Sequence, residues 1–196
     1  MPHRVAGSLR RIDPSAVRIL VVCTGNICRS PMAEAMLRQR LDERGVPAEI
    51  TSAGFVTEDR PASPPAVALL SGRGMDLRPH RSQRVTVDHL GDPDLIVCME
   101  RMHVREIAVL DRDAFERTFT LPDLARRAEA HGPRRADEGV RDWFRRIGSG
   151  RRPTDVLGVA PEDEVPDPYG RPVAAYRRTA ETLDELLDVV VSHLFP

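Results

Sequence analysis

The sequence contains no lysine, so all 29 of its fixed positive side-chain charges are arginines. Without lysine the chain cannot form a Schiff base, and it cannot carry the Gly-Lys pair of a Walker-type phosphate loop. Any phosphate group must therefore be bound by arginine side chains and backbone amides. Because 30 acidic residues balance the arginines, the chain has no overall positive field for a nucleic acid, and we expect no nucleic-acid partner.

Cysteine and long apolar runs are also scarce. Cys23, Cys28 and Cys98 are the three cysteines, an odd number that does not make a disulfide framework, so their interest is reactivity. No apolar run approaches the roughly 20 residues of a membrane span. The run over residues 19–23 is also too short for the core of a signal peptide. We expect a cytoplasmic protein that does not associate with membranes.

Apolar patterns alternate between strand and helix along the chain after a polar segment over residues 1–16, which we predict to be a flexible extension. The predicted strands are residues 17–23, 49–53, 94–99 and 117–121. The first predicted helix begins at Ser30 and ends at Gly45. Three more cover residues 65–72, 102–110 and 122–130, and a final helix begins at Val173. This alternation indicates an α/β fold with one domain over residues 17–196, in which a parallel sheet has helices on both faces.

One segment interrupts this alternation. Residues 131–164 are rich in Gly, Pro, Arg and Asp and are longer than an ordinary connection, so we interpret them as an insertion that forms a lid. Within it, Val140, Trp143, Phe144 and Ile147 have the spacing of one helix face, which predicts a short amphipathic helix.

The segment CTGNICRS, residues 23–30, carries the candidate chemistry. It follows the first predicted strand and leads into a helix, where loop amides can surround a phosphate-sized anion. The same amides favour a thiolate, so Cys23 is the candidate nucleophile. Arg29 has the planar fork that matches two phosphoryl oxygens.

A second segment supplies a candidate general acid. Thiolate attack on phosphorus needs a proton donor for the leaving oxygen. Asp167 lies in VPDPYG, residues 165–170, where two prolines restrict the backbone just before the last helix. Tyr169 offers an aromatic surface for a flat substrate.

With these motifs in place, the sequence resembles the low-molecular-weight protein tyrosine phosphatases from residue 17 to the last helix, except for the insertion. The family's Cys-x5-Arg-Ser loop and its Asp-Pro-Tyr loop are both present, in the family's order. Further similar segments are TSAG at 51–54, HRS at 80–82 and DLIVCME at 94–100. The resemblance implies a four-stranded parallel sheet of the phosphotyrosine protein phosphatase I type and hydrolysis of phosphomonoesters without metal or cofactor. Substrates would be phosphotyrosine proteins or small aryl phosphates, and phosphate and other oxyanions would inhibit.

The resemblance also implies roles for individual residues. Cys23 would become a phosphocysteine, while Asp167 would protonate the leaving oxygen and then activate water. The substrate's phosphoryl group would be bound by the loop from Thr24 to Ser30, that is by Thr24, Gly25, Asn26, Ile27, Cys28, Arg29 and Ser30, with Tyr169 as a wall. Ser30 would also stabilise the thiolate, and Asn26, Ser52 and His80 would hold the loop's shape. Cys28 is either a small structural residue or a redox partner of the nucleophile.

The slot for the substrate departs from the family. Gly170 replaces a second aromatic residue, and residues 56–59 lack the bulky aromatic that often forms the other wall. Our hypothesis is that the inserted helix supplies Trp143 or Phe144 as a substitute wall. The alternative is that this pair is the apolar face of a short helix.

Other functions remain as alternatives. A small-molecule phosphatase of a biosynthetic pathway would suit an open slot. A thioredoxin-coupled arsenate reductase needs two further redox cysteines, but Arg105 stands where a partner of Cys98 would be. Protein arginine phosphatases resemble this chain with threonine in place of Ile27 and phenylalanine in place of Tyr169, so both positions favour tyrosine. A phosphocarrier domain would need neither Arg29 nor the Asp-Pro loop. A zinc site at Cys23 and Cys28 lacks further ligands.

Overall fold

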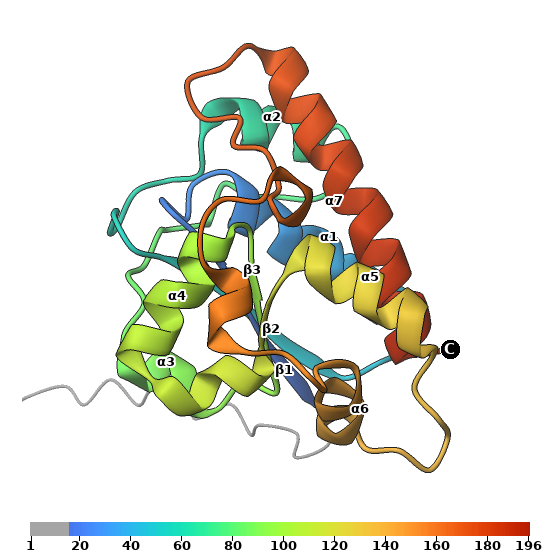
Figure 1. Ribbon diagram of the computed structural model, residues 1–196. Coiled ribbons are helices and arrows are strands. Elements are labelled where there is room, and N and C mark those ends of the chain that lie inside the picture. Colours follow the sequence, from blue (N-terminus) through green and yellow to red (C-terminus); the bar gives the residue numbers. More distant parts are fainter. Residues whose placement is uncertain (1–15) are drawn as a thin grey trace, which may run out of the picture.

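A parallel four-stranded sheet forms the centre of the computed structural model, which describes residues 16–196 (Figure 1). Its strands are β1 (Val17–Cys23), β2 (Ala48–Gly54), β3 (Leu95–Cys98) and β4 (Thr118–Thr120), and their order is β2-β1-β3-β4. The expected α/β fold is therefore confirmed, and each strand lies within two residues of its predicted ends. The flexible extension expected for residues 1–16 falls, but for Ala16, outside the described residues.

Seven helices occur among the described residues. They are α1 (Arg29–Glu43), α2 (Pro64–Ser71), α3 (Val87–Gly91), α4 (Arg101–Leu110), α5 (Leu121–His131), α6 (Val140–Ile147) and α7 (Val173–Leu194). Three 3₁₀ turns join them, η1 (Arg112–Arg117), η2 (Pro153–Val156) and η3 (Pro161–Asp163).

β1 is apolar along its length because both of its faces are covered. Ile19 and Val21 point to a core formed with α1, α5 and α7, whereas Leu20 and Val22 point to a second core formed with α3 and α4. The two cores lie on opposite faces of the sheet, as successive residues of a strand do. This three-layer arrangement fixes β1 in the middle of the molecule.

The chain changes direction across the sheet at β1. β2 pairs with one edge of β1 and β3 with the other, so the connections from β1 lead to both sides. In open α/β sheets, ligands bind at such a switch point, beyond the carboxyl ends of the strands. The loop after Cys23 lies at this point.

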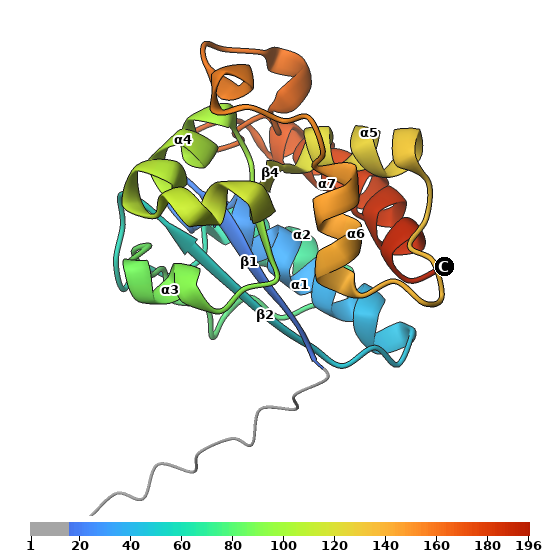
Figure 2. The same cartoon turned by 60° about the horizontal axis from the view of Figure 1, so that its bottom comes forward.

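The helix α6 lies at the other end of the sheet (Figures 1 and 2). Arg141 of α6 is bonded to Asp94, which precedes β3 and also accepts the amide of Arg18 at the start of β1. Trp143 and Phe144 are 0% and 2% exposed and belong to the core with α5 and α7. The expectation that this helix is a lid, with either ring as a substrate wall, is therefore wrong. Both rings form the apolar face of a short helix.

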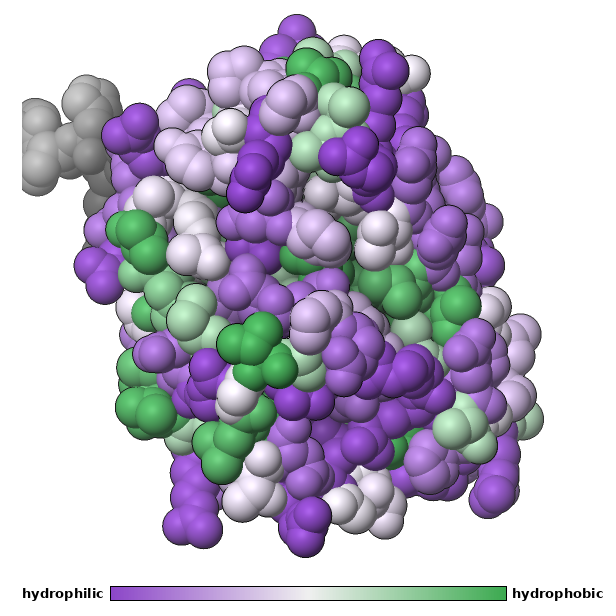
Figure 3. All heavy atoms as spheres, turned by 45° about the horizontal axis from the view of Figure 1, so that its top comes forward, coloured by the Kyte–Doolittle hydropathy of each residue, from purple (hydrophilic) through white to green (hydrophobic). Residues whose placement is uncertain are grey.

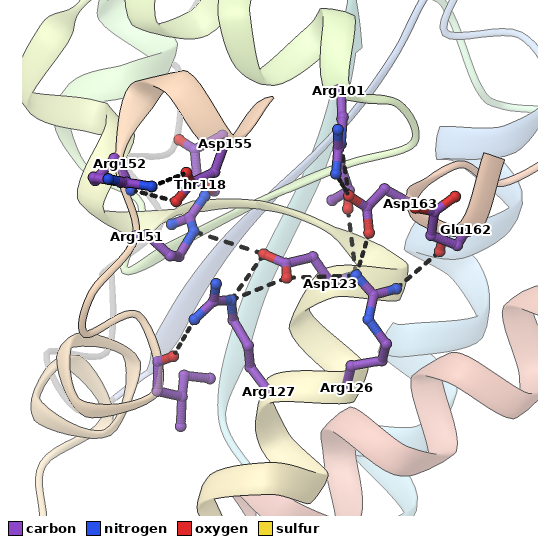
Figure 4. Close-up of polar contacts among 12 residues, drawn as sticks. Arg101, Thr118, Asp123, Arg126, Arg127, Arg151, Arg152, Asp155, Glu162 and Asp163 are labelled. Carbon is purple, nitrogen blue, oxygen red and sulfur yellow. Dashed lines mark hydrogen bonds and ion pairs between the residues drawn. The ribbon is translucent and has the colours of Figure 1, made fainter. Parts of the chain in front are cut away.

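After α6 the chain passes β4, where Figure 4 shows Arg151 beside Thr118, and continues to Asp163, which is bonded to Arg101 shortly after β3. We call residues 148–164 the strap. Arg151 of the strap is almost buried and donates to the carbonyl oxygen of Thr118 at 2.5 Å, so it satisfies an acceptor of the edge strand. Its guanidinium lies 3.9 Å from the centre of the Phe119 ring. Burial lowers the pKa of Arg151 to about 10, which leaves it charged at neutral pH.

The face in Figure 3 is mostly polar, and its apolar side chains form separate small groups. Within residues 16–196, no helix is both long and apolar enough to cross a lipid bilayer.

Candidate active site

The loop between β1 and α1 has a tightly constrained backbone. Asn26 has a φ of 49°, in the left-handed region that non-glycine residues seldom adopt. Gly54, at the end of β2 opposite Cys23, lies so close that a Cβ there would be 2.8 Å from the amide nitrogen of Asn26. Only glycine lets β2 approach the loop this closely.

The side chain of Asn26 holds the loop from behind. It is fully buried and donates to Ser30 Oγ at 3.0 Å and to Ser52 Oγ at 2.8 Å, and its own oxygen accepts the amide of Gln83. His80 Nε2 is 2.7 Å from the carbonyl oxygen of Asn26 and must donate, since a carbonyl only accepts. The structure therefore brings together Asn26, Ser30, Ser52 and His80.

The polarity of these bonds determines what Cys23 receives. Ser52 donates its hydroxyl to Glu34 at 2.7 Å, and Ser30 accepts from Asn26, so the hydroxyl proton of Ser30 is free for Cys23 Sγ at 3.0 Å. The amide of Asn26 donates to the same sulfur at 3.2 Å. Two donors are thus aimed at one sulfur atom, where they can stabilise negative charge.

Arg29 is 1% exposed and its guanidinium reaches acceptors on three other segments. Nη1 donates to Glu100 and to the carbonyl oxygen of Val165, the latter at 3.1 Å. Nη2 donates to Asp167 Oδ2 at 2.7 Å and to Thr24 Oγ1 at 3.2 Å. Nε is buried without a protein acceptor among the described residues. One arginine thus joins the β1–α1 loop, the end of β3 and the Asp-Pro-Tyr segment.

Asp167 stands beside the loop although 138 residues separate it from Arg29. Its Oδ1 accepts the amide of Tyr169 at 3.0 Å, so the turn orients the carboxylate. Its side chain is 43% exposed, and Tyr169 is 65% exposed. The carboxylate can therefore exchange protons with solvent and face a ligand.

A cavity of about 230 Å³ opens above the loop. Among the predicted residues, Cys23, Thr24, Gly25, Ile27, Cys28, Arg29, Asp167 and Tyr169 line it. Asn26, Ser30, Ser52 and His80 do not, because their side chains lie behind the loop. Val56 and Thr57 also line the cavity, and they belong to the segment where the sequence lacks an aromatic residue.

Sequence reasoning missed the role of two residues that follow β3, one just before α4 and one in its first turn. Glu100 pairs with Arg29, and His103 Nε2 is 3.0 Å from Thr24 Oγ1. His103 is fully buried and stacks on Phe55. Its pKa falls to about 3, chiefly because burial disfavours the charged ring and also because Arg29 is near. The signal available was position, since parallel strands bring their carboxyl ends to one edge of the sheet.

The other two cysteines differ from Cys23. Cys28 donates to Ser63 Oγ at 3.1 Å, and burial raises its pKa. Cys98 is fully buried in β3, and burial raises its pKa more strongly. All three cysteines are free thiols. Cys98 therefore packs in the core, as expected, and is poorly placed for the redox relay of an arsenate reductase.

Comparison with known proteins gives a consistent result. Residues 18–142 match the family model described as low molecular weight phosphotyrosine protein phosphatase. A probable low molecular weight protein-tyrosine-phosphatase, EpsP of Ralstonia solanacearum, is 47% identical over 107 residues, which cover 54% of this chain and 71% of that protein. A protein-arginine-phosphatase of Bacillus subtilis is 29% identical over 177 residues, covering 90% of this chain and 95% of that one.

Among solved structures, a low molecular weight protein tyrosine phosphatase from T. tengcongensis is 31% identical to this chain, with a TM-score of 0.68. The match covers 91% of this chain and all of that one. The family model covers well over half of the chain. The chain therefore belongs to the low molecular weight phosphotyrosine protein phosphatases, cysteine-dependent hydrolases that act through a phosphocysteine intermediate.

Proposed function

We propose that this chain hydrolyses phosphotyrosine in proteins, with Cys23 as nucleophile, Arg29 as phosphoryl ligand and Asp167 as general acid and base. The observation that carries the proposal is the meeting of these three side chains around one cavity, although the family match at residues 18–142 ends before Asp167. Each is placed there by a different element or loop.

The first step transfers the phosphoryl group to sulfur. The Cys23 thiolate forms a bond to phosphorus as the bond to the phenolic oxygen breaks, and Asp167 gives that oxygen its proton. The incoming phosphate dianion competes with Asp167 for Arg29, which would release the Asp167 carboxyl group to face the leaving oxygen. The amides of Thr24 to Arg29 would surround the phosphoryl oxygens, and inorganic phosphate would compete for the same place.

The second step releases phosphate. Asp167, now ionised, takes a proton from water as the water oxygen bonds to phosphorus and the sulfur–phosphorus bond breaks. Cys23 leaves as a thiolate, which the hydroxyl of Ser30 and the amide of Asn26 stabilise. These residues complete the reaction with no metal or cofactor, so EDTA should not change the rate.

We also propose a cellular location, the cytoplasm, and the limits of the phosphatase domain. Three free thiols suit the reducing cytoplasm. We also propose that residues 17–196 are one phosphatase domain and that residues 131–164 are an insertion in it.

The test is hydrolysis of an aryl phosphate by the wild type, Cys23→Ser, Asp167→Asn and the control Asp142→Asn. Asp142 is an exposed carboxylate of α6, remote from the cavity. We expect no turnover for Cys23→Ser, a loss of about 100-fold or more for Asp167→Asn, and no change for the control. An active Cys23→Ser variant would refute the mechanism.

A second candidate substrate is phosphoarginine, because relatives named protein-arginine-phosphatase align over 90% of the chain. Ile27 lines the cavity with an apolar side chain and Tyr169 borders it, and these two residues favour an aryl ester. Peptides that carry phosphotyrosine, phosphoarginine or phosphoserine should be compared with alkyl phosphates. Preference for phosphoarginine, or equal rates on alkyl phosphates, would overturn the assignment to phosphotyrosine.

A further inference from the structure

Asp163, at the end of the strap, is bound by arginines from two helices. Its carboxylate is 7% exposed and is bonded to Arg101 Nε of α4 at 2.6 Å and to Arg126 of α5. Figure 4 shows the two guanidinium groups converging on this side chain. Each carboxylate oxygen has an arginine partner, so the strap's end is fixed relative to α4 and α5 together.

Asp163 lies just before the Asp-Pro-Tyr segment in the chain. Asp163 precedes Asp167 by four positions, and the backbone between them is held by the amide of Val165, which donates to Met99 O at 2.8 Å. Thr179 of α7 then donates to Pro166 O at 3.0 Å. The segment therefore reaches Asp167 held at successive positions, by the side chain of Asp163 and by the backbone of Val165 and Pro166.

Arg101 links the same cluster to the phosphoryl ligand. It follows Glu100, which pairs with Arg29, so the arginine that holds Asp163 is adjacent in the chain to the carboxylate that holds Arg29. The general acid and the phosphoryl-binding arginine are thus both connected to the first turn of α4.

The ion pairs of Asp163 are better explained by a need to fix the position of the acid segment than by a contribution to folding stability. Buried ion pairs contribute little to stability compared with apolar side chains of similar volume, because desolvation offsets their attraction, whereas they impose a defined arrangement. A proton donor needs such an arrangement, since misplacement by about 1 Å can cost roughly 100-fold in rate.

We propose that Asp163 is a positioning residue for Asp167: its ion pairs with Arg101 and Arg126 hold the acid segment so that the Asp167 carboxyl group faces the leaving oxygen. This inference rests on the proposed function. The strap would then affect the rate of the reaction, although none of its residues lines the cavity. Proton donation matters most for a poor leaving group, so the effect of Asp163 must depend on the leaving group.

The test uses Asp163→Asn, with Glu138→Gln as the matched control. Glu138 is also paired with an arginine within the insertion, but it lies beside α6 and bonds to Arg146. kcat/KM is measured for aryl phosphates whose phenols range from p-nitrophenol to phenol. For Asp163→Asn we expect a loss of about tenfold with phenyl phosphate and less than about twofold with p-nitrophenyl phosphate. The control should match the wild type throughout.

A double-mutant cycle separates positioning from general damage. If Asp163 acts through Asp167, adding Asp163→Asn to Asp167→Asn should change kcat/KM by less than about twofold. Three results for Asp163→Asn would overturn the proposal. They are an equal loss of kcat/KM for every leaving group, a loss in the Asp167→Asn background as large as in the wild type, or no loss of kcat/KM at all.

Two further measurements keep the result interpretable. If Asp163→Asn does not fold, Arg126→Gln removes one of the two partners at a half-exposed side chain and should show the same dependence on the leaving group. Uniform losses for this variant would count against positioning. A wild type without aryl phosphatase activity would refute the proposed function itself, an outcome distinct from failure of the Asp163 cycle.

Discussion

At the scale of single residues, the β1–α1 loop depends on the missing side chain of Gly54. In Gly54→Ala, the new Cβ would lie 2.8 Å from Asn26 N and 2.9 Å from Cys23 O, and these backbone atoms cannot move without displacing the loop. We expect the free energy of unfolding to fall by about 1–3 kcal/mol and kcat/KM to fall roughly 100-fold. Urea denaturation and aryl phosphate hydrolysis measure the two effects.

Gly91→Ala is the control for this substitution. A Cβ at Gly91 would meet no atom within 4 Å, and the residue has no positive φ. Its effect on the free energy of unfolding should stay within about 0.5 kcal/mol. Equal effects of the two substitutions would show that close packing at Gly54 is unimportant.

His103 makes stability depend on pH. Its pKa is about 3 in the folded protein and about 6.5 in the unfolded chain. Between these values the unfolded chain binds a proton that the folded protein does not, so stability is fully present above pH 6.5 and is lost as the pH falls. From pH 7 to pH 5 the wild type should lose about 2 kcal/mol more than His103→Asn, as measured by urea denaturation. Parallel losses in the two proteins would contradict a neutral buried His103.

The sequence motifs predicted Cys23, Arg29 and Asp167 as site residues because each has a characteristic neighbourhood in the chain. Glu100 ends the similar segment DLIVCME but had no role assigned to it, and His103 lies in no such segment. Their contacts with Arg29 and Thr24 span 71 and 79 residues and arise only when β3 pairs beside β1. Local patterns do not encode such contacts.

At the scale of elements, the strap is attached to the sheet through Arg151. Arg151→Ala removes donors from Thr118 O and Phe115 O and leaves a space against the Phe119 ring. The free energy of unfolding should fall by about 2–4 kcal/mol. Arg152→Ala, at a side chain that is 76% exposed, should change it by less than about 0.5 kcal/mol. Similar values from urea denaturation would show that the strap is not anchored at Arg151.

Periodicity predicted the helix over residues 140–147 with its correct bounds but not its position. An amphipathic pattern shows that one face is buried, not which partner covers it, so Trp143 and Phe144 could be assigned to the substrate slot. The five-residue helix α3 was not predicted because it is too short to show a helical period.

At the scale of the whole molecule, the two ends of the sheet differ: one carries the candidate site and the other is covered by a helix. The carboxyl ends carry Cys23, Glu100 and the neighbouring Asp167, whereas the amino ends are covered by α6 through Asp94 and Arg141. The alternation of strands and helices was sufficient to predict the layers, because buried parallel strands and covering helices each have a distinct apolar pattern. The route of residues 131–164 around β4 depends on arginine contacts that no pattern displays.

This separation has an optical consequence. The chain's single tryptophan, Trp143, is fully buried in α6, and its indole nitrogen donates to Gly132 O at 3.2 Å. Its fluorescence should therefore be blue-shifted in the folded protein, should shift to the red in urea, and should stay unchanged when phosphate fills the cavity at the opposite end of the sheet. A change in emission on adding phosphate would show that the two ends communicate. Otherwise the native protein contains its own reporter of folding, one that is silent towards ligands.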